Sequence, residues 1–180
     1  MEVPDKSLPR ATFEDLALPL FDQLYNFAHW LAQDASEAED LVQETYAKAL
    51  RGFSSFRTGT NFRAWIFRIL RNSFLTSRTG LKTRVPLEDE AAEAIASKAP
   101  TPEEVLVEQA NREIVRDALT ELPVPYREIL LLCEVEEMSY EEIALVLGIP
   151  AGTVMSRLHR ARKGLRNNLV GKIRGGPHGV

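Results

Sequence analysis

The chain has 180 residues, of which 44% are hydrophobic, and a formal net charge of −4. This length fits one large domain or two small ones. No apolar run of about 18 residues occurs, which argues against a membrane-spanning helix, and the N-terminus lacks the apolar segment of a secretory signal. The single cysteine, Cys133, excludes an internal disulfide. We therefore expect a small buried hydrophobe at that position and a reducing, cytoplasmic compartment.

The charges are sorted into blocks. Residues 51–87 hold eight Lys or Arg and no acid, and residues 143–180 hold seven and no acid. Between them, residues 88–142 hold sixteen Asp or Glu against four Lys or Arg. This pattern favours two polyanion-binding surfaces, with acidic stretches left for protein partners. The alternative is chance clustering on two solvated faces.

Helical periodicity runs through the first third of the chain. Residues 13–34 repeat large apolar side chains every three or four positions, as one face of a helix does. Residues 34–52 predict a second helix, which Asp34 or Ser36 caps. After a loop rich in Gly, Ser and Thr, residues 62–78 predict a third helix.

The middle of the chain breaks this pattern. Residues 80–107 are rich in Ala, Glu, Pro and Thr and predict a flexible linker. A further helix begins at Pro102 and ends at Pro123 and Pro125, and another covers residues 126–137. The sequence therefore predicts an all-α protein of two small helical domains joined by the linker, with the first domain at 10–79, the linker at 80–107, the second domain at 108–170 and a floppy tail at 171–180.

A helix-turn-helix pattern follows the acidic block. Ser139 and Glu142 have capping-box spacing at the start of a short helix that Gly148 closes. A short turn leads into a second helix whose apolar seam consists of Val154, Leu158, Ala161 and Leu165. Such a motif places the N-terminal part of its second helix in a DNA major groove.

The remaining faces of this second helix are polar and free of acids. Arg160 is long enough for a bidentate contact to guanine, and Ser156 can contact more than one base. Arg157, Arg162 and Lys163 are better placed for phosphates, which position a protein without reading sequence. The alternative is an ordinary surface helix of a bundle.

The first basic block carries six aromatic residues among its cations, namely Phe53, Phe56, Phe62, Trp65, Phe67 and Phe74. Unpaired bases stack on aromatic rings while arginines follow the backbone of a single strand. For Phe62 and Trp65 a place in the core is the stronger interpretation. For Phe56, in the loop, the two interpretations are equal.

No catalytic site is expected. The three histidines are scattered and Cys133 has no partner cysteine, so neither a metal nor another cofactor is supported. No phosphate-binding glycine loop or nucleophile elbow occurs. Two other classes remain as alternatives: an enzyme acting on nucleic acid, which lacks ligands and a nucleophile, and a stand-alone helix-turn-helix regulator, which leaves the aromatic, basic block unexplained.

Two segments carry a family resemblance, DLVQETYAKALRGFSSFRTGTNFRAWIFRILRNSF and LPVPYREILLLCEVEEMSYEEIALVLGIPAGTVMSRLHRARKGLR. Together they resemble bacterial sigma factors of the extracytoplasmic-function (ECF) group, in the sigma-70 family, over about Phe13 to Arg166. The resemblance implies two helical domains, sigma-2 and sigma-4. It also implies a protein that binds core RNA polymerase, directs it to promoters and helps to open the DNA, under the control of an anti-sigma factor.

The resemblance further implies three sets of contacts. Docking on the clamp helices of the polymerase β′ subunit is implied for Asp40, Leu41, Gln43, Glu44 and Lys48. Recognition of the −10 element is implied for Phe56, Arg57, Gly59, Thr60, Asn61, Arg68, Arg71, Asn72 and Arg78. Recognition of the −35 element is implied for Thr153, Met155, Ser156, Arg157, His159, Arg160, Arg162 and Lys163. Sigma-4 is also expected to dock on the flap of the β subunit.

Overall fold

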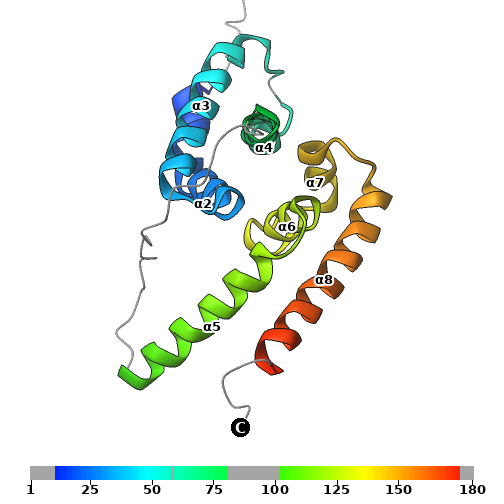
Figure 1. Cartoon of the computed structure of the whole chain (residues 1–180). Coiled ribbons are helices and arrows are strands. Elements are labelled where there is room, and N and C mark those ends of the chain that lie inside the picture. Colours follow the sequence, from blue (N-terminus) through cyan, green and yellow to red (C-terminus); the bar gives the residue numbers. More distant parts are fainter. Residues whose placement is uncertain (1–10, 58, 81–101, 175–180) are drawn as a thin grey trace, which may run out of the picture.

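A computed structural model describes residues 11–57, 59–80 and 102–174, and within these residues every regular element is helical (Figure 1). The first domain contains α1 (Phe13–Ala17), α2 (Phe21–Ala32), α3 (Ala35–Gly52) and α4 (Phe62–Gly80). The second contains α5 (Pro102–Thr120), α6 (Val124–Leu130), α7 (Tyr140–Leu147) and α8 (Ala151–Arg174). The predicted all-α class is confirmed. Most of the predicted linker lies outside the described residues, while its last six positions belong to α5.

The single helix predicted for residues 13–34 is divided in two. A 3₁₀ turn over Leu18–Leu20 separates α1 from α2. Pro19 lies in this turn, where its missing N–H and its ring prevent a regular helix from continuing. For the second predicted helix, the sequence offered Asp34 or Ser36 as the cap. Asp34 caps α3, because its side chain accepts from the backbone N–H of Glu37 at 2.6 Å.

The second domain departs from the sequence-based expectation at two points. The helix α6 begins at Val124 rather than Tyr126, with Pro125 inside its first turn, where proline costs no hydrogen bond. It then widens into a π-helical turn over Leu131–Val135. Two residues after this turn lies Glu137, whose φ of 51° is unusual for a residue other than glycine.

The predicted tail is partly wrong, because α8 continues to Arg174. Lys172 holds this end by donating to Glu121, directly after α5, at 2.6 Å, and basic residues in the last turn of a helix interact favourably with its dipole. Residues 175–180 lie outside the described part of the chain.

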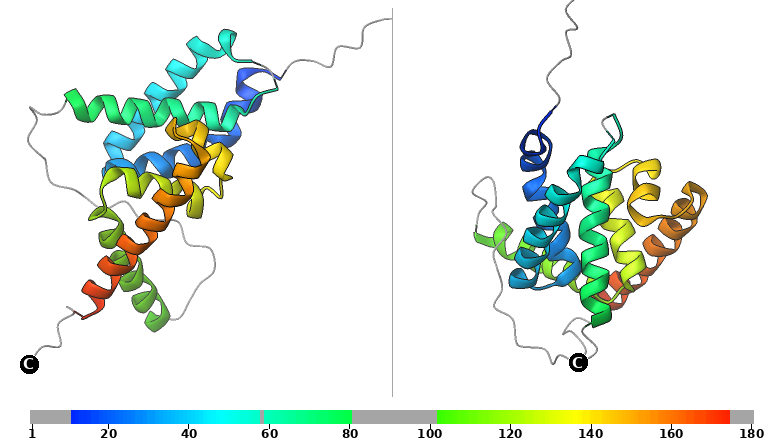
Figure 2. Two further views of the ribbon diagram at one scale, coloured as in Figure 1. Left: turned by 90° about the vertical axis from the view of Figure 1, so that its right-hand side faces the viewer. Right: turned by 90° about the horizontal axis from the view of Figure 1, so that it is seen from above.

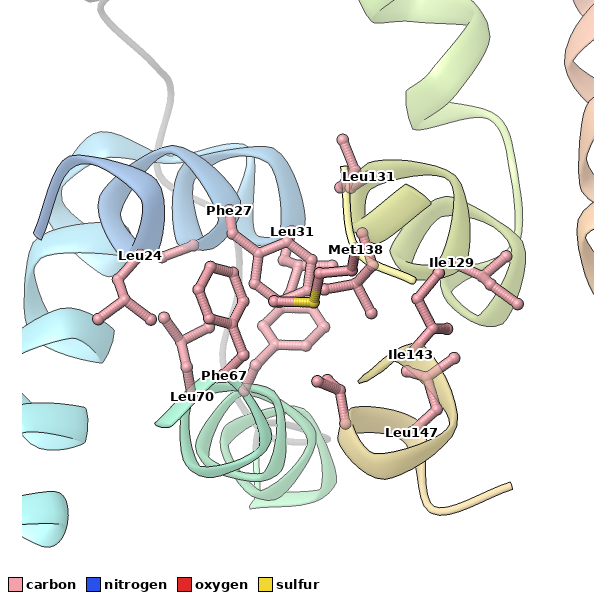
Figure 3. Close-up of a cluster of buried hydrophobic side chains, with 14 of the residues drawn as sticks. Leu24, Phe27, Leu31, Phe67, Leu70, Ile129, Leu131, Met138, Ile143 and Leu147 are labelled. Atoms are coloured by element: carbon pink, nitrogen blue, oxygen red, sulfur yellow. The ribbon is translucent and has the colours of Figure 1, made fainter. Parts of the chain in front are cut away.

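The two domains pack directly against each other. Helix α4 lies beside α7, as Figure 2 shows, and α2 contacts α6. Figure 3 shows side chains from both domains meeting in one cluster, with Leu31 and Phe67 facing Met138 and Ile143. Each of these four side chains is at most 3% exposed. Burying one such side chain contributes about 1.5–3 kcal/mol, so the hydrophobic effect holds the domains together.

Candidate nucleic-acid interface

The helix-turn-helix predicted for the second domain is confirmed by its caps. The backbone N–H of Glu142 donates to the Ser139 hydroxyl at 3.2 Å, and the Glu142 carboxylate accepts from the backbone N–H of Ser139 at 2.8 Å. Gly148 ends α7 with φ at 65°, a left-handed conformation that glycine adopts without steric cost. These two ends fix the short helix α7 against the start of α8.

The polar faces of α8 are available to solvent. Its predicted seam is confirmed, with Val154, Leu158 and Ala161 at most 1% exposed and Leu165 half-buried. Among the residues assigned to the −35 element, Met155, Ser156, His159, Arg160, Arg162 and Lys163 are exposed, while Thr153 and Arg157 are half-buried. The N-terminal half of α8 therefore presents an exposed surface that is free of acids and, apart from Met155, largely polar.

One of these cations already has a protein partner. Arg162 donates from Nη2 and Nε to one carboxylate oxygen of Glu134, at 2.7 and 3.0 Å. The hydrogen bond to Glu134 raises the pKa of the Arg162 guanidinium. Because both side chains are about half exposed, this pair contributes little to stability and leaves Arg162 able to exchange Glu134 for a phosphate.

The aromatic residues of the first basic block are mainly core. The ring of Phe56 lies 5.3 Å from that of Phe62, 5.1 Å from Trp65 and 6.1 Å from Phe53, measured between centroids. Such distances are those of packed aromatic pairs. Packing against the core is therefore the better account of Phe56, which forms the inner wall of the loop that precedes α4.

Asn61 has two structural roles that the sequence analysis did not anticipate. Its side-chain oxygen accepts from the backbone N–H of Ala64 at 2.9 Å, which caps α4. Its side-chain nitrogen donates to Glu142 of the second domain at 2.7 Å. An asparagine directly before the first residue of a predicted helix is a recognisable capping signal, whereas the contact with Glu142 depends on how the domains pack.

Arg71 is the most tightly held of the residues assigned to the −10 element. Its Nε and Nη2 donate to the two carboxylate oxygens of Glu128 at 2.8 and 3.0 Å. The Glu128 side chain is 1% exposed and that of Arg71 is 17% exposed. The pair is a bidentate, nearly buried bridge between the two domains.

Arg63, which the sequence analysis did not assign, makes a further contact with an acid of the second domain. Its Nη2 donates to the backbone carbonyl of Glu136 at 2.7 Å and to the Glu136 carboxylate at 3.2 Å. Its Nε donates to Gln23 at 3.0 Å. Burial raises the pKa of the Glu136 carboxyl, and Arg63 opposes that shift.

The other residues assigned to the −10 element are divided between solvent and the first domain. Arg57, Gly59, Thr60, Arg68 and Asn72 are exposed. Arg78 instead donates to the carbonyl of Ala32 at 3.2 Å and to Glu37 at 3.1 Å. A role for Arg78 in holding a DNA strand would require it to leave both partners.

The surface assigned to polymerase docking lies on α3. Asp40, Gln43 and Glu44 are exposed along this helix. Leu41 is 2% exposed and belongs to the core, so it supports that surface only by packing. Lys48 is half-buried and donates to Ser73 of α4 at 3.0 Å, besides its ion pair with Glu44.

The acidic block is not simply a surface for protein partners, which corrects the expectation drawn from its composition. Glu128 is fully buried and Glu136 is 6% exposed. Both form ion pairs with arginines of the first domain, Glu128 with Arg71 and Glu136 with Arg63. Within the described residues, no three His, Cys, Asp or Glu side chains are grouped so that they could hold a metal ion. None of the described helices is long and apolar enough to cross a membrane.

The fold defines an all-helical protein of two packed domains, one of which contains a helix-turn-helix. The family model for sigma-70 region 2 matches residues 19–83, and the model for sigma-70 region 4 matches residues 112–165. The chain is 38% identical over 156 residues to the ECF RNA polymerase sigma factor EcfG of Rhodopseudomonas palustris, covering 86% of this chain and 83% of that protein.

Two further similarities agree with this result. The ECF sigma factor SigE of Mycolicibacterium smegmatis is 35% identical over 170 residues, which is 89% of this chain and 65% of that protein. The sigma factor RpoE of Bartonella quintana, crystallised with the anti-sigma factor NepR, is 30% identical and superimposes with a TM-score of 0.70 over 87% of this chain and 97% of that one. The chain belongs to the ECF group of RNA polymerase sigma factors. It is a transcription initiation factor of this group, which directs RNA polymerase to promoters.

Proposed function

We propose that this sigma factor binds core RNA polymerase through α3 and reads promoters through α8 and through the loop and helix at residues 56–78. The observation that carries the proposal is the acid-free, exposed polar face of α8 on a capped helix-turn-helix. It occurs in one chain with a second basic helix, α4, and with three exposed polar residues on α3. A stand-alone DNA-binding regulator needs neither the second basic helix nor the exposed polar residues of α3.

At the −35 element, the N-terminal half of α8 enters the major groove. Arg160 reads a guanine through two hydrogen bonds, and Ser156 contacts a neighbouring base. Arg157, Arg162 and Lys163 bind phosphates and fix the register of the helix. Met155 and His159 also face the groove, so the bases that they meet depend on the promoter.

At the −10 element, the first domain holds a separated strand. Arg57, Gly59, Thr60 and Asn61 form the exposed rim of the loop, over the packed ring of Phe56. Extracting a base from the duplex costs a few kcal/mol, which capture by this loop offsets. Arg68, Arg71, Asn72 and Arg78 lie along α4 and its end and accompany the strand backbone.

Docking on the polymerase involves both domains. Asp40, Gln43 and Glu44 of α3 contact the clamp helices of β′, while Leu41 and Lys48 support that surface from within. The sigma-4 domain docks on the flap of β. The chain performs no catalysis of its own, and it acts in the cytoplasm, where the polymerase and the promoters are found.

An anti-sigma factor controls this chain. The observation that supports this partner is the likeness to a sigma factor crystallised in complex with NepR, where one superposition takes in 87% of this chain and therefore parts of both domains. An anti-sigma factor that prefers this packed arrangement shifts the population toward it and lowers the amount available to the polymerase.

A pull-down of purified core polymerase, followed by promoter-dependent transcription from a genomic template pool, tests the proposal. Asp40→Lys is the test variant, because it reverses an exposed charge at the centre of the docking surface. Glu14→Lys is the matched control, because Glu14 is exposed on α1 and lies outside that surface. We expect the first substitution, and not the second, to weaken capture. A folded chain that neither binds core polymerase nor starts transcription would favour a stand-alone helix-turn-helix regulator instead.

A further inference from the structure

Three side chains of the first domain donate hydrogen bonds to three acids of the second. Arg71 binds Glu128 at 2.8 and 3.0 Å. Arg63 binds Glu136 at 3.2 Å and its carbonyl at 2.7 Å. Asn61 binds Glu142 at 2.7 Å. All three donors lie on α4 or at its N-cap, and all three acids lie between the start of α6 and the first turn of α7.

The same donors suit a nucleic-acid strand. A guanidinium binds a carboxylate and a phosphate with the same two parallel N–H···O bonds. An asparagine amide that donates to a carboxylate oxygen also donates to a base edge or a phosphate. We infer that Glu128, Glu136 and Glu142 act as an internal substitute for the promoter strand, so that the free chain holds itself closed with Asn61 and Arg71 of its −10 surface, and the neighbouring Arg63, occupied. This inference rests on the proposed role of α4 in binding the −10 strand.

The backbone of the second domain is shaped to deliver these acids. The π-helical turn over Leu131–Val135 and the positive φ of Glu137 directly precede and follow Glu136. Residues in such sparsely populated conformations cost about 1–3 kcal/mol and persist only where the surroundings enforce them. Here the distorted turn presents both the carbonyl and the carboxylate of Glu136 to Arg63, which a regular helix end would not do.

The closed arrangement also prevents α4 and α8 from binding the −10 and −35 elements of one promoter at the same time. The −35 and −10 elements are named for positions about 25 base pairs apart, which is roughly 85 Å of straight duplex at about 3.4 Å per base pair. A compact chain of this length has a radius of gyration of about 16 Å, or a diameter of roughly 40 Å. With α4 packed on α7, the surfaces of α4 and α8 are therefore too close to occupy both elements at once.

The contacts between the two domains can be replaced by contacts with polymerase and DNA. A buried ion pair gains little net free energy, because desolvation of the two charges cancels most of their attraction. The three contacts with the acids therefore contribute to the closed register, together with the hydrogen bonds of Arg127 and Thr120 across the domains, while the apolar cluster around Met138 supplies the stability. Polymerase and DNA can replace both, since they offer phosphates to α4 and protein surface to the domains.

The first experiment compares Glu128→Gln and Glu136→Gln with Glu121→Gln, which removes the same charge from an ion pair with Lys172, within the second domain and outside the residues assigned to DNA. Two quantities are measured on the full chain without polymerase: the radius of gyration by small-angle X-ray scattering, and binding of a fluorescein-labelled pool of single-stranded DNA of mixed sequence. We expect the first two variants to expand and to bind DNA roughly tenfold more tightly, as removal of an unfavourable opening step does. Equal dimensions and equal affinity in all three variants would overturn the inference.

A second experiment removes any dependence on how the Gln variants fold. The Thr120 hydroxyl donates to the Gln33 side-chain oxygen at 3.1 Å, so these residues face each other across the domains outside the binding surfaces. A cleavable bis-maleimide joins Gln33→Cys to Thr120→Cys in a chain that also carries Cys133→Ser. We expect the linked chain to give no promoter-dependent transcript with core polymerase and the cleaved chain to regain it. Equal transcription before and after cleavage would overturn the inference. Transcription by neither form would overturn the proposed function instead, and scattering would still decide whether the domains close.

Discussion

The guanidinium of Arg127 in the second domain donates from Nη1 to the carbonyl of Leu31 in the first, at 3.3 Å. It also bonds three carbonyls at the end of α5 and just beyond it, those of Leu119, Thr120 and Leu122 at 3.1, 2.6 and 3.2 Å. The last carbonyls of a helix have no partner within it and carry the negative end of the helix dipole. One side chain, only 8% exposed, thus serves the C-terminal ends of both α5 and α2.

Arg127→Met is expected to destabilise the chain by about 3 kcal/mol, because several buried carbonyls lose their donor while the methionine keeps most of the packing. Burial, with a smaller effect from Arg78, lowers the pKa of the Arg127 guanidinium, yet the group remains a cation at neutral pH. Urea unfolding followed by circular dichroism gives the change in free energy. Arg51→Met, at an exposed position on α3, should cost less than about 0.5 kcal/mol. Equal losses in the two variants would show that the four bonds contribute nothing.

Two glycines of the helix-turn-helix should respond to alanine in opposite directions. Gly148 has φ at 65°, where a side chain costs about 1 kcal/mol even though the nearest atom to a new Cβ, Nη2 of Arg68, would lie at an unstrained 4.0 Å. Gly152 lies in the first turn of α8, and a Cβ there meets nothing within 4 Å. Alanine at 152 should therefore stabilise the chain by up to about 1 kcal/mol. Thermal unfolding of both variants shows whether each substitution raises or lowers the stability of the chain. A loss of stability at both positions would contradict this account.

At the −35 element, Arg160→Ala is expected to weaken binding at one or two base pairs by about 1–3 kcal/mol. Lys163→Ala is the matched control, since Lys163 is also exposed on α8 and is assigned to phosphate. It should weaken all promoters equally and reduce the salt dependence of binding. Affinities of holoenzyme for a set of promoters with single substitutions distinguish the two patterns. A uniform loss for Arg160→Ala would reassign that arginine to the phosphate backbone.

The sequence predicted most of the helices, their caps and the exposed polar face of α8, because these depend on local chemistry. Ser139, Glu142 and Gly148 each act within a few residues of their own position, and the seam of α8 follows from helical periodicity alone. Pro19 and Lys172 were misjudged for a related reason. A proline inside an apolar helical pattern and a lysine near a chain end are weak signals until their neighbours are known.

What the sequence could not predict is the packing of one domain on the other. Arg71 was assigned to the −10 element, but nothing local indicates that Glu128, 57 positions later, lies against it. Arg63 and Glu136 were missed for the same reason. Acids in the second domain were expected to face solvent or partners, and their burial follows only from long-range contacts. The site was therefore predictable as a set of surfaces but not as a closed arrangement.

The half-buried thiol of Cys133 provides a test of the environment at the edge of the second domain. Burial, followed by the nearby Glu134, raises the pKa of the Cys133 thiol, while Arg162, whose Nη2 lies 3.8 Å from Sγ, opposes the shift. Because the thiolate is the reactive form, alkylation by iodoacetamide should be slower than for a free cysteine, with a rate that rises through a pKa above the ordinary value. Glu134→Gln should lower that pKa and speed the reaction at fixed pH, whereas Arg162→Gln should raise it and slow the reaction. A pKa below the ordinary value in the unmodified chain would mean that Arg162 outweighs burial, and the thiol would then be a reactive site rather than part of the packing.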